Sequence, residues 1–238
     1  MTNIKLKCVN SLDILHKIPN NYFDLCLTDP PYNLGKDYGP LVNDSLSHQE
    51  YLEFSKQWFT EAKRLAKGLI FTPGWNQLRM WLTEIEYPKG IAIWYNNNQM
   101  SDSNLGGWNH YEPLLVYGKV AMGKNVLNIP VSEQHIFKNT VHPNPKPVVL
   151  MEAILRTSTI GGKKIEKVID PFVGVGTTAM ACKKLNIRCV GYDINCEYIK
   201  EAEYYLNQPS SAWVIQKLKK ITHSYLKDFN LYKKELKC

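Results

Sequence analysis

Short apolar runs alternate with longer amphipathic segments along most of the chain. The runs that read as strands are residues 5–9, 23–28, 68–72, 91–95, 113–117, 167–170 and 188–192. The segments with apolar residues at helical spacing are 11–16, 49–65, 75–85, 148–157, 177–185 and 196–206. This alternation is typical of α/β proteins with a mainly parallel sheet, and it predicts seven strands.

Three long stretches fit neither period and are predicted to be loops. They are residues 33–48, 95–113 and 119–146, which contain many Asn, Ser, Gly or Pro residues. Structureless stretches of this length in a compact domain are usually functional or disordered. No internal repeat, low-complexity tract or linker separates the other segments, so we expect one main domain with modest insertions.

The chain carries 29 Lys and Arg residues against 22 Asp and Glu residues, a formal charge of +7 at pH 7. A positive charge permits a polyanionic partner, because lysines and arginines gain affinity by releasing the counterions of phosphate groups. Much of the excess lies in residues 209–238, which are predicted to form a basic helical tail. This tail either contacts nucleic acid or only aids solubility. Its lysines are Lys217, Lys219, Lys220, Lys227, Lys233, Lys234 and Lys237, against Asp228 and Glu235.

No apolar run approaches the length that spans a bilayer, and the first residues lack the apolar core of a signal peptide. The expectation is a soluble, cytoplasmic protein. The six cysteines are scattered, with no Cys-x-x-Cys pair and no histidines at metal-ligand spacing. We therefore predict no metal site and assign the cysteines no chemistry, since most of them lie where a reduced cysteine acts as a small apolar side chain.

A glycine-bearing turn follows the predicted strand 167–170. Gly174 and Gly176 lack a Cβ, so backbone amides can approach a ligand closely, and the threonines that follow can cap the next helix. The amino terminus of that helix favours a carboxylate. The next strand ends at Asp193, about 20 residues onward, where nucleotide-binding folds place an acid for the ribose hydroxyls. Because no complete Gly-x-Gly-x-x-Gly or phosphate loop is present, a nucleoside carrying a carboxylate and an ammonium group suits the turn best.

A second motif, Asp29-Pro30-Pro31-Tyr32, follows the predicted strand 23–28. The carboxyl end of a strand in an open α/β sheet borders the usual ligand crevice. The two prolines fix the backbone and remove two amide donors, so we expect the local carbonyl groups to be rigid, outward-facing and unpaired. Asp29 and the Pro30 carbonyl can accept the hydrogens of an exocyclic amine, and Tyr32 offers a face to an extruded base. The arrangement suits direct methyl transfer, driven by positioning and electrostatics.

These motifs resemble those of the beta-class amino DNA methyltransferases, in which the catalytic motif precedes the cofactor motif. Asp29-Pro30-Pro31-Tyr32 resembles the catalytic motif of that family. The glycine-bearing turn, Asp170-Pro171-Phe172-x-Gly174-x-Gly176-Thr177-Thr178, resembles the cofactor motif. Between them, His142-Pro143-x-x-Lys146-Pro147 resembles the family's His-Pro-x-x-Lys-Pro element. The three elements stand in the family's order, and the resemblance covers residues 4–207.

The resemblance implies a Rossmann-like, seven-stranded, mostly parallel sheet with one antiparallel strand, in circularly permuted order. It implies S-adenosyl-L-methionine as the cofactor, no metal, and catalytic roles for Asp29, Pro30, Pro31 and Tyr32. The residues implied to bind the cofactor are Asn10, Asp29, His142, Lys146, Asp170, Phe172, Gly174, Gly176, Thr177, Thr178 and Asp193. Asn10 stands where the family usually has an acid that meets the adenine of the cofactor, and its amide oxygen can still accept a hydrogen bond.

The same resemblance implies that residues 1–238 form a single methyltransferase domain, with residues 96–146 as a target-recognition insertion. Loops carried by a rigid scaffold commonly bind the substrate, so we also expect DNA contacts from residues 33–48. The expected substrate is double-stranded DNA, in a prokaryotic or phage-infected cell. A second copy of the chain and a cognate restriction endonuclease are candidate partners.

The preferred reaction is methylation of the 6-amino group of adenine. An acid in the first position of the catalytic motif is more typical of adenine than of cytosine enzymes in this family. Methylation of the cytosine 4-amino group stays open, as do an amine in RNA or protein and a silent DNA-binding relative. Methylation of cytosine carbon 5 is excluded, because it requires a cysteine nucleophile, typically in Pro-Cys, and the sequence has no Pro-Cys pair.

Overall fold

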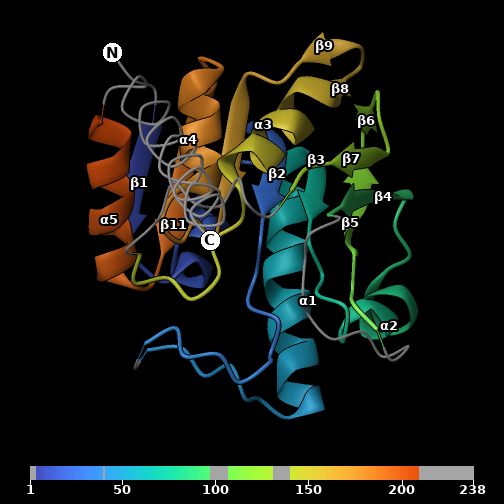
Figure 1. Cartoon of the computed structure of the whole chain (residues 1–238), viewed down its shortest axis with the longest axis vertical. Helices are drawn as coiled ribbons and strands as arrows, with labels where there is room; N and C mark the ends of the chain where they lie inside the picture. Colours follow the sequence, from blue (N-terminus) through green and yellow to red (C-terminus); the bar gives the residue numbers. More distant parts are fainter. Residues whose placement is uncertain (1–3, 40, 97–106, 131–139, 209–238) are drawn as a thin grey trace, which may run out of the picture.

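The computed structural model describes residues 4–39, 41–96, 107–130 and 140–208 (Figure 1). Its central sheet has eight strands. Their order is β1 (Ile4–Cys8), β11 (Arg188–Asp193), β10 (Lys167–Asp170), β2 (Phe23–Thr28), β3 (Ala66–Phe71), β5 (Tyr111–Gly118), β4 (Gly90–Tyr95) and β7 (Val126–Asn128). Among these described strands, only β5 runs antiparallel to its neighbours. The predicted α/β fold, mostly parallel with one antiparallel strand, is confirmed.

The predicted count of seven strands is wrong by one. All seven predicted strands form, and β7 adds an eighth by pairing with β4. A small second sheet joins β6 (Val120–Met122), β8 (Ser158–Ile160) and β9 (Lys163–Lys164). Both β6 and β7 come from the stretch predicted to be a loop, because a strand of three residues is too short to show a period of its own.

Four helices form where the apolar spacing predicts them. They are α1 (His48–Leu65), α3 (Val148–Thr157), α4 (Thr177–Lys184) and α5 (Cys196–Asn207). The predicted helix 11–16 is instead two 3₁₀ turns, η1 (Ser11–Asp13) and η2 (Leu15–Lys17), because so short a segment cannot complete an α-helical hydrogen-bond ladder. The predicted helix 75–85 divides into α2 (Leu78–Met80) and a π turn η3 (Trp81–Ile85), which closes with a bond from the Glu86 amide to the Trp81 carbonyl.

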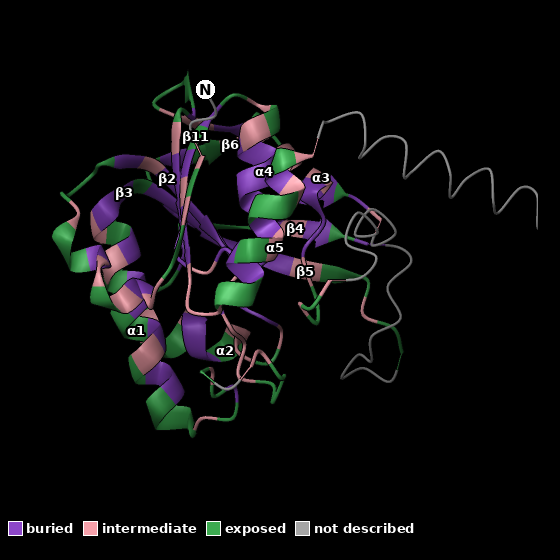
Figure 2. Cartoon of the chain, turned by 90° about the vertical axis from the view of Figure 1, so that its left-hand side faces the viewer, coloured by how far each residue is buried: buried purple, intermediate pink, exposed green. Residues whose placement is uncertain are grey.

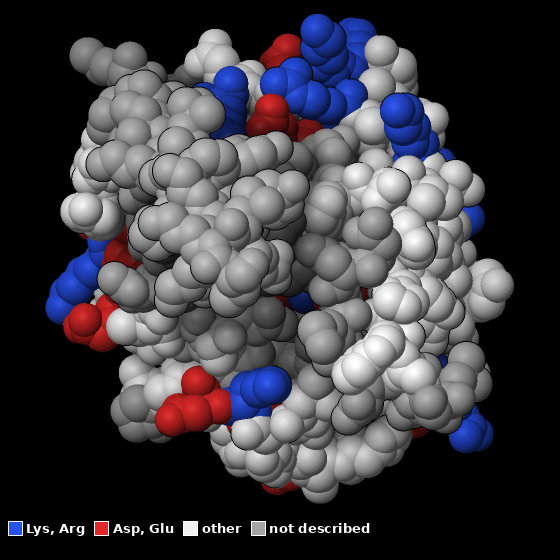
Figure 3. Space-filling model, viewed as in Figure 1, with Lys and Arg blue, Asp and Glu red and all other residues white. Residues whose placement is uncertain are grey.

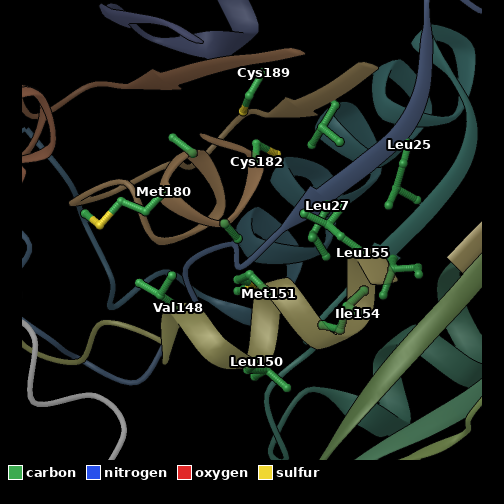
Figure 4. Close-up of a cluster of buried hydrophobic side chains, with 14 of the residues drawn as sticks. Leu25, Leu27, Val148, Leu150, Met151, Ile154, Leu155, Met180, Cys182 and Cys189 are labelled. Carbon is green, nitrogen blue, oxygen red and sulfur yellow. The ribbon is translucent and has the colours of Figure 1, made fainter. Parts of the chain in front are cut away.

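The helices cover both faces of the sheet. Figure 2 shows α1 on one side of the strands and α4 and α5 on the other. Successive residues of β2 face opposite sides of the sheet. Leu25 and Leu27 pack in the layer of α3 and α4, whereas Cys26 packs in the layer of α1. The first layer is drawn in Figure 4, whose labelled side chains are Leu25, Leu27, Val148, Leu150, Met151, Ile154, Leu155, Met180, Cys182 and Cys189.

Helix α1 begins at a capping box. The Ser47 side chain accepts a bond from the Glu50 amide, and the Glu50 side chain accepts one from the Ser47 amide. The buried face of the helix carries Tyr51, Trp58 and other large side chains. The Tyr51 hydroxyl donates to the Pro31 carbonyl, which holds the start of the helix close to the end of β2.

The assignment of no chemistry to the cysteines is wrong for two of them. Cys8, at the end of β1, and Cys196, at the start of α5, form a disulfide with their Cα atoms 5.0 Å apart. The two meet because β1 and β11 are neighbours in the sheet, with Cys8 opposite Asp193. Cys26, Cys182 and Cys189 are free and buried, as expected of small apolar side chains.

Across the described residues, no helix combines the length and apolar character needed to cross a membrane. The same residues contain no group of three or more His, Cys, Asp or Glu side chains placed to hold a metal ion. The predicted basic tail, residues 209–238, lies outside the described part of the chain, as do residues 97–106 and 131–139 of the predicted insertion.

Candidate active site

A cavity of about 350 Å³ opens at the carboxyl edge of the sheet, where β2, β10 and β11 end. Because these strands are parallel neighbours, both sequence motifs and the acid at the end of β11 meet at this edge. The predicted site residues in the cavity wall are Asn10, Asp29, Pro30, Pro31, Tyr32, His142, Lys146, Phe172 and Asp193. The wall also includes Tyr38, Asp44, Tyr51, Phe54 and Tyr198, which the motifs do not contain.

Asp29 follows the last residue of β2 and is held by three groups. Its Oδ1 atom accepts bonds from the hydroxyl groups of Tyr32 and Thr72. Its Oδ2 atom lies 3.6 Å from the Nζ atom of Lys146. The carboxylate is therefore fixed through one oxygen, while the other faces the ammonium group in the wall of the cavity.

The rest of the catalytic turn is fixed through its backbone. The Tyr51 hydroxyl donates to the Pro31 carbonyl at 2.9 Å, and Gln77 Nε2 donates to the Tyr32 carbonyl at 3.0 Å. The expectation of unpaired, outward-facing carbonyl groups is therefore wrong for Pro31 and Tyr32, because α1 and the segment before α2 supply donors. Gly74 lies against the Tyr32 ring, where a Cβ would come within 2.7 Å of the ring.

Lys146 is buried and lies between two carboxylates. Its Nζ atom is 2.9 Å from Glu112 Oε2, closer than to Asp29, and faces the rings of Tyr32 and Trp94 at 5.1 and 5.8 Å. Burial alone would lower the pKa of Lys146, but the two carboxylates raise that pKa well above its ordinary value. The lysine therefore carries its charge inside the protein.

His142 lies between two tyrosine rings, with centroids 4.8 Å from Tyr198 and 5.7 Å from Tyr38. Burial lowers the pKa of its imidazole to about 4, so the ring is neutral at pH 7. Its Nδ1 atom accepts a bond from the Asn144 amide at 3.2 Å, which leaves the proton on Nε2. His142 is thus a neutral residue of the cavity wall, and the Nε2 edge of its ring lies next to Gly174.

The glycine turn contributes to the wall mainly through Pro171 and Phe172. Gly174, Gly176, Thr177 and Thr178 are buried behind that wall, together with Asp170. Helix α4 has Gly176 as its N-cap, with no side-chain capping bond, so the prediction that a threonine caps it is wrong. The two threonines are buried instead, 8% and 1% exposed.

Asp193 links the glycine turn to the cavity. One carboxylate oxygen accepts the Gly174 amide at 2.9 Å and the other accepts the Asn195 amide at 2.8 Å. Burial raises the pKa of this carboxyl group, and the bonds from the backbone amides oppose the rise. Asp193 is thereby oriented at the cavity wall.

Asp170 performs a different task. It is 2% exposed, and its Oδ1 atom accepts the Thr28 hydroxyl at 2.6 Å and the Phe172 amide at 3.1 Å. Burial raises the pKa of Asp170 to about 7 despite these bonds. The side chain fastens the end of β10 to the end of β2, and it does not reach the cavity wall.

Two further wall residues have local partners. The Phe172 ring packs against Phe54 at 5.9 Å and edge-on against Trp58 at 5.7 Å, giving the cavity an aromatic side. The Asn10 side-chain oxygen accepts the Leu12 amide at 3.2 Å and caps the first 3₁₀ turn. The acceptor expected to face a ligand is therefore engaged with the backbone.

Asp44 organises the loop that follows the catalytic turn. Its carboxylate accepts the amides of Asn33, Leu34 and Lys36 at 2.8 to 3.0 Å, and its carbonyl accepts the Gly35 amide. Asn33 adds a two-way bond to the backbone of Leu46. Although it lacks regular structure, this part of the predicted loop is a fixed wall of the cavity.

Three partners that the motifs miss are Thr72, Glu112 and Asp44. Thr72 follows the last residue of β3, and Glu112 is the second residue of the antiparallel β5, so both lie at the carboxyl edge of the parallel strands. A search for polar residues at the ends of the predicted strands would have found Thr72, whereas Glu112 lies at this edge only because β5 is antiparallel. The sequence gives no comparable signal for Asp44.

Comparison with known proteins gives concordant matches. A family model described as DNA methylase (N6_N4_Mtase) matches residues 23–204. The type II methyltransferase M.HpaI of Haemophilus parainfluenzae is 33% identical over 233 residues, covering 84% of this chain and 73% of that protein. The type II methyltransferase M2.DpnII of Streptococcus pneumoniae is 44% identical over 237 residues, covering 81% and 85% of the two chains.

A solved structure has a similar fold. The PvuII DNA methyltransferase, described as cytosine-N4-specific, superposes with a TM-score of 0.63 at 15% sequence identity. The match covers 90% of this chain and 92% of that one. At this level of identity the likeness shows a common fold.

Proposed function

The chain belongs to the N6/N4 DNA methylase family, and from that premise we propose that it methylates the 6-amino group of adenine in double-stranded DNA. The methyl donor of the family is S-adenosyl-L-methionine. The observation that carries the proposal is that the catalytic turn and the acid at the end of β11 border the same cavity. A cofactor held by one side of that cavity would lie beside a base held by the other.

The residues of the cavity suit this cofactor. Its volume of about 350 Å³ falls in the range of small-molecule sites. Asp193 presents a carboxylate for ribose hydroxyls, and Phe172 presents an aromatic ring for the adenine. His142 is a further polar residue of the wall. When bound, the cofactor supplies an electrophilic methyl group.

The catalytic turn would hold the accepting amine. Asp29 Oδ2 and the Pro30 carbonyl would accept its two hydrogens and direct its lone pair towards the methyl group. Tyr32 would stack on the base after its extrusion from the duplex. The Asp29 carboxylate is already held by Tyr32 and Thr72, so little rearrangement is required before the reaction.

Residues 96–146 are proposed to recognise the DNA target within a single methyltransferase domain, and the tail 209–238 to contact phosphates. Among the described residues, Figure 3 shows Lys and Arg side chains gathered where Figure 1 places β8 and β9. That end includes the exposed Lys163 and Lys164, shortly before β10 begins and thus at the edge opposite the cavity. Phosphate contacts near the cavity would therefore come from other parts of the chain or from a second copy.

A homodimer is proposed on this ground, and light scattering of the DNA complex tests it. A complex of one chain per duplex would reject the dimer.

Because the relatives are type II methyltransferases, we also propose a cognate restriction endonuclease as partner. DNA methylated by the purified protein should resist that nuclease, and DNA that remains fully cleavable would reject the pairing.

The deciding experiment identifies the methylated base. Purified protein and tritiated S-adenosyl-L-methionine are incubated with unmethylated genomic DNA, with Asp29→Ala as the control, and the DNA is hydrolysed to nucleosides. Labelled 6-methyladenine that disappears in the variant is the expected result. Labelled 4-methylcytosine would move the reaction to the cytosine amine, and unlabelled DNA despite cofactor binding would redirect the search to RNA or protein amines.

A further inference from the structure

Three charged side chains form a partly buried cluster at the cavity wall. The Nζ atom of Lys146 lies 2.9 Å from Glu112 and 3.6 Å from Asp29. The side chains of these three residues are only 2%, 14% and 23% exposed. The rings of Tyr32 and Trp94 cover the ammonium group. With two carboxylates and one ammonium group, the cluster has a formal charge of minus one.

The members of the cluster differ in their access to the cavity. Asp29 and Lys146 belong to the wall, whereas Glu112 stands behind them on β5 and does not line the cavity. Without Glu112, the charges of Asp29 and Lys146 would cancel. The wall also carries Asp44, Asp193 and Lys36. Glu112 therefore sets the net charge of the cluster next to the catalytic turn, without touching a bound molecule.

We propose that Glu112 is a positioning residue that gives this cluster a net negative charge, which favours the positive charge of the cofactor's sulfonium group. The inference rests on the proposed function in that the cavity must hold the cofactor. S-adenosyl-L-methionine and its demethylated product differ by one methyl group and one positive charge. Glu112 therefore favours the cofactor over the product, which aids exchange of one for the other after each reaction.

Burial makes this effect measurable. The interaction between two charges in a partly buried site is several times stronger than in water. Glu112 also anchors Lys146, since their pair is the shorter of the two contacts of the ammonium group. Removing the charge of Glu112 would leave Lys146 to neutralise Asp29, and the part of the wall next to the catalytic turn would lose its net negative charge.

The test compares binding of the cofactor and the product by isothermal titration calorimetry without DNA. Glu112→Gln keeps the size of the side chain and an oxygen for Lys146, but removes the charge. The affinity for S-adenosyl-L-methionine should fall about tenfold or more, while the affinity for S-adenosyl-L-homocysteine should change less than about twofold. A role in folding alone would change both affinities equally.

Two further variants serve as controls. The double variant Glu112→Gln with Lys146→Met removes one charge of each sign, leaves Asp29, and restores the net charge of minus one. Its ratio of cofactor to product affinity should return to within about twofold of the wild-type ratio. Glu152→Gln applies the same change to a glutamate paired with Arg156 on α3, and neither affinity should change.

The outcomes separate the two proposals. Equal losses of both affinities in Glu112→Gln, or no loss of cofactor affinity, would overturn the role of Glu112 while leaving the proposed function intact. A double variant that stays as unselective as the single variant would also overturn it. Wild-type protein that binds neither compound would overturn the proposed function and this inference with it.

Discussion

The catalytic turn, residues 29–32, and the glycine turn, residues 171–178, follow two neighbouring parallel strands but build the site in different ways. All residues of the catalytic turn reach the cavity wall, where Asp29 meets Lys146 and Tyr32. The glycine turn brings Pro171 and Phe172 to the wall and buries the rest. Motifs of similar prominence in a sequence can thus act through side-chain chemistry in one case and through backbone shape and packing in the other.

The contrast is sharpest between two aspartates. Asp29 lies in the wall and faces a buried ammonium group, whereas Asp170 is sealed beneath it against Thr28 and the Phe172 amide. The same change, aspartate to asparagine, should therefore have different consequences at the two positions.

The largest effect is expected from Asp29→Asn. The variant keeps the shape of the side chain. It replaces a carboxylate oxygen that accepts hydrogen bonds by an amide NH2 group that donates them. We expect kcat for methyl transfer to fall about a thousandfold, as when a key electrostatic group is removed from other enzymes. Steady-state assays with tritiated cofactor measure kcat. A variant that retains a tenth of the wild-type kcat would contradict a direct role of the Asp29 carboxylate in the reaction.

Asp170→Asn should affect stability rather than chemistry. Burial raises the pKa of Asp170 to about 7, from an ordinary value of 3.8. Between these two values the folded protein holds a proton that the unfolded chain has released. The contribution of Asp170 to the free energy of unfolding is therefore largest below pH 4 and is lost as the pH rises towards 7. Asparagine keeps an acceptor for Thr28 and does not titrate. The variant therefore avoids this loss of stability, which amounts to about 4 kcal/mol at most.

The measurement for Asp170→Asn is urea denaturation between pH 5 and pH 8. The variant should gain stability relative to wild type as the pH rises, with kcat retained. An Asp170→Asn variant that loses as much activity as Asp29→Asn would contradict the assignment of Asp170 to stability and of Asp29 to chemistry.

Gly176→Ala tests the packing role of the glycine turn. Gly176 has a φ of +87°, and an added Cβ would lie 2.8 Å from the Ala202 Cβ of α5. Strain and overpacking together should lower the free energy of unfolding by about 3 kcal/mol. Gly90→Ala is the matched control, because nothing lies within 4 Å of the added atom there. Equal stabilities of the two variants would contradict the assignment.

The smallest effect is expected from Asp44→Asn, in the loop after the catalytic turn. Asparagine keeps one acceptor oxygen, so about half of the bonds to the backbone amides of Asn33, Leu34 and Lys36 would be lost. Hydrogen exchange of these amides should accelerate about tenfold, corresponding to about 1 to 2 kcal/mol of local stability. Exchange unchanged from an Asp13→Asn control, an exposed acid, would show that Asp44 does not hold this loop.

Much of this arrangement could be predicted from the sequence because strand ends in a parallel sheet share an edge. Asp29, Phe172 and Asp193 were expected near one another on that ground, and the structure places all of them in one cavity wall. The role of each residue stays a prediction. Features that depend on which strands are neighbours could not be predicted from local patterns.

Glu112 is the clearest example of such a feature. It reaches Lys146 because the antiparallel β5 lies between β3 and β4, an order that periodicity does not reveal. The disulfide between Cys8 and Cys196 likewise requires β1 beside β11. The burial of Thr178 behind the wall follows from the packing of α4 against the sheet and α3, which a motif read along the chain does not contain.

A crystal structure with bound S-adenosyl-L-methionine would show whether the catalytic turn and the glycine turn serve one reaction. We predict that the cofactor occupies the cavity of about 350 Å³, with its ribose at Asp193, its adenine beside Phe172 and its methyl group towards Asp29. Cofactor bound elsewhere, or bound with its methyl group directed away from the catalytic turn, would contradict the claim that the two turns serve one reaction.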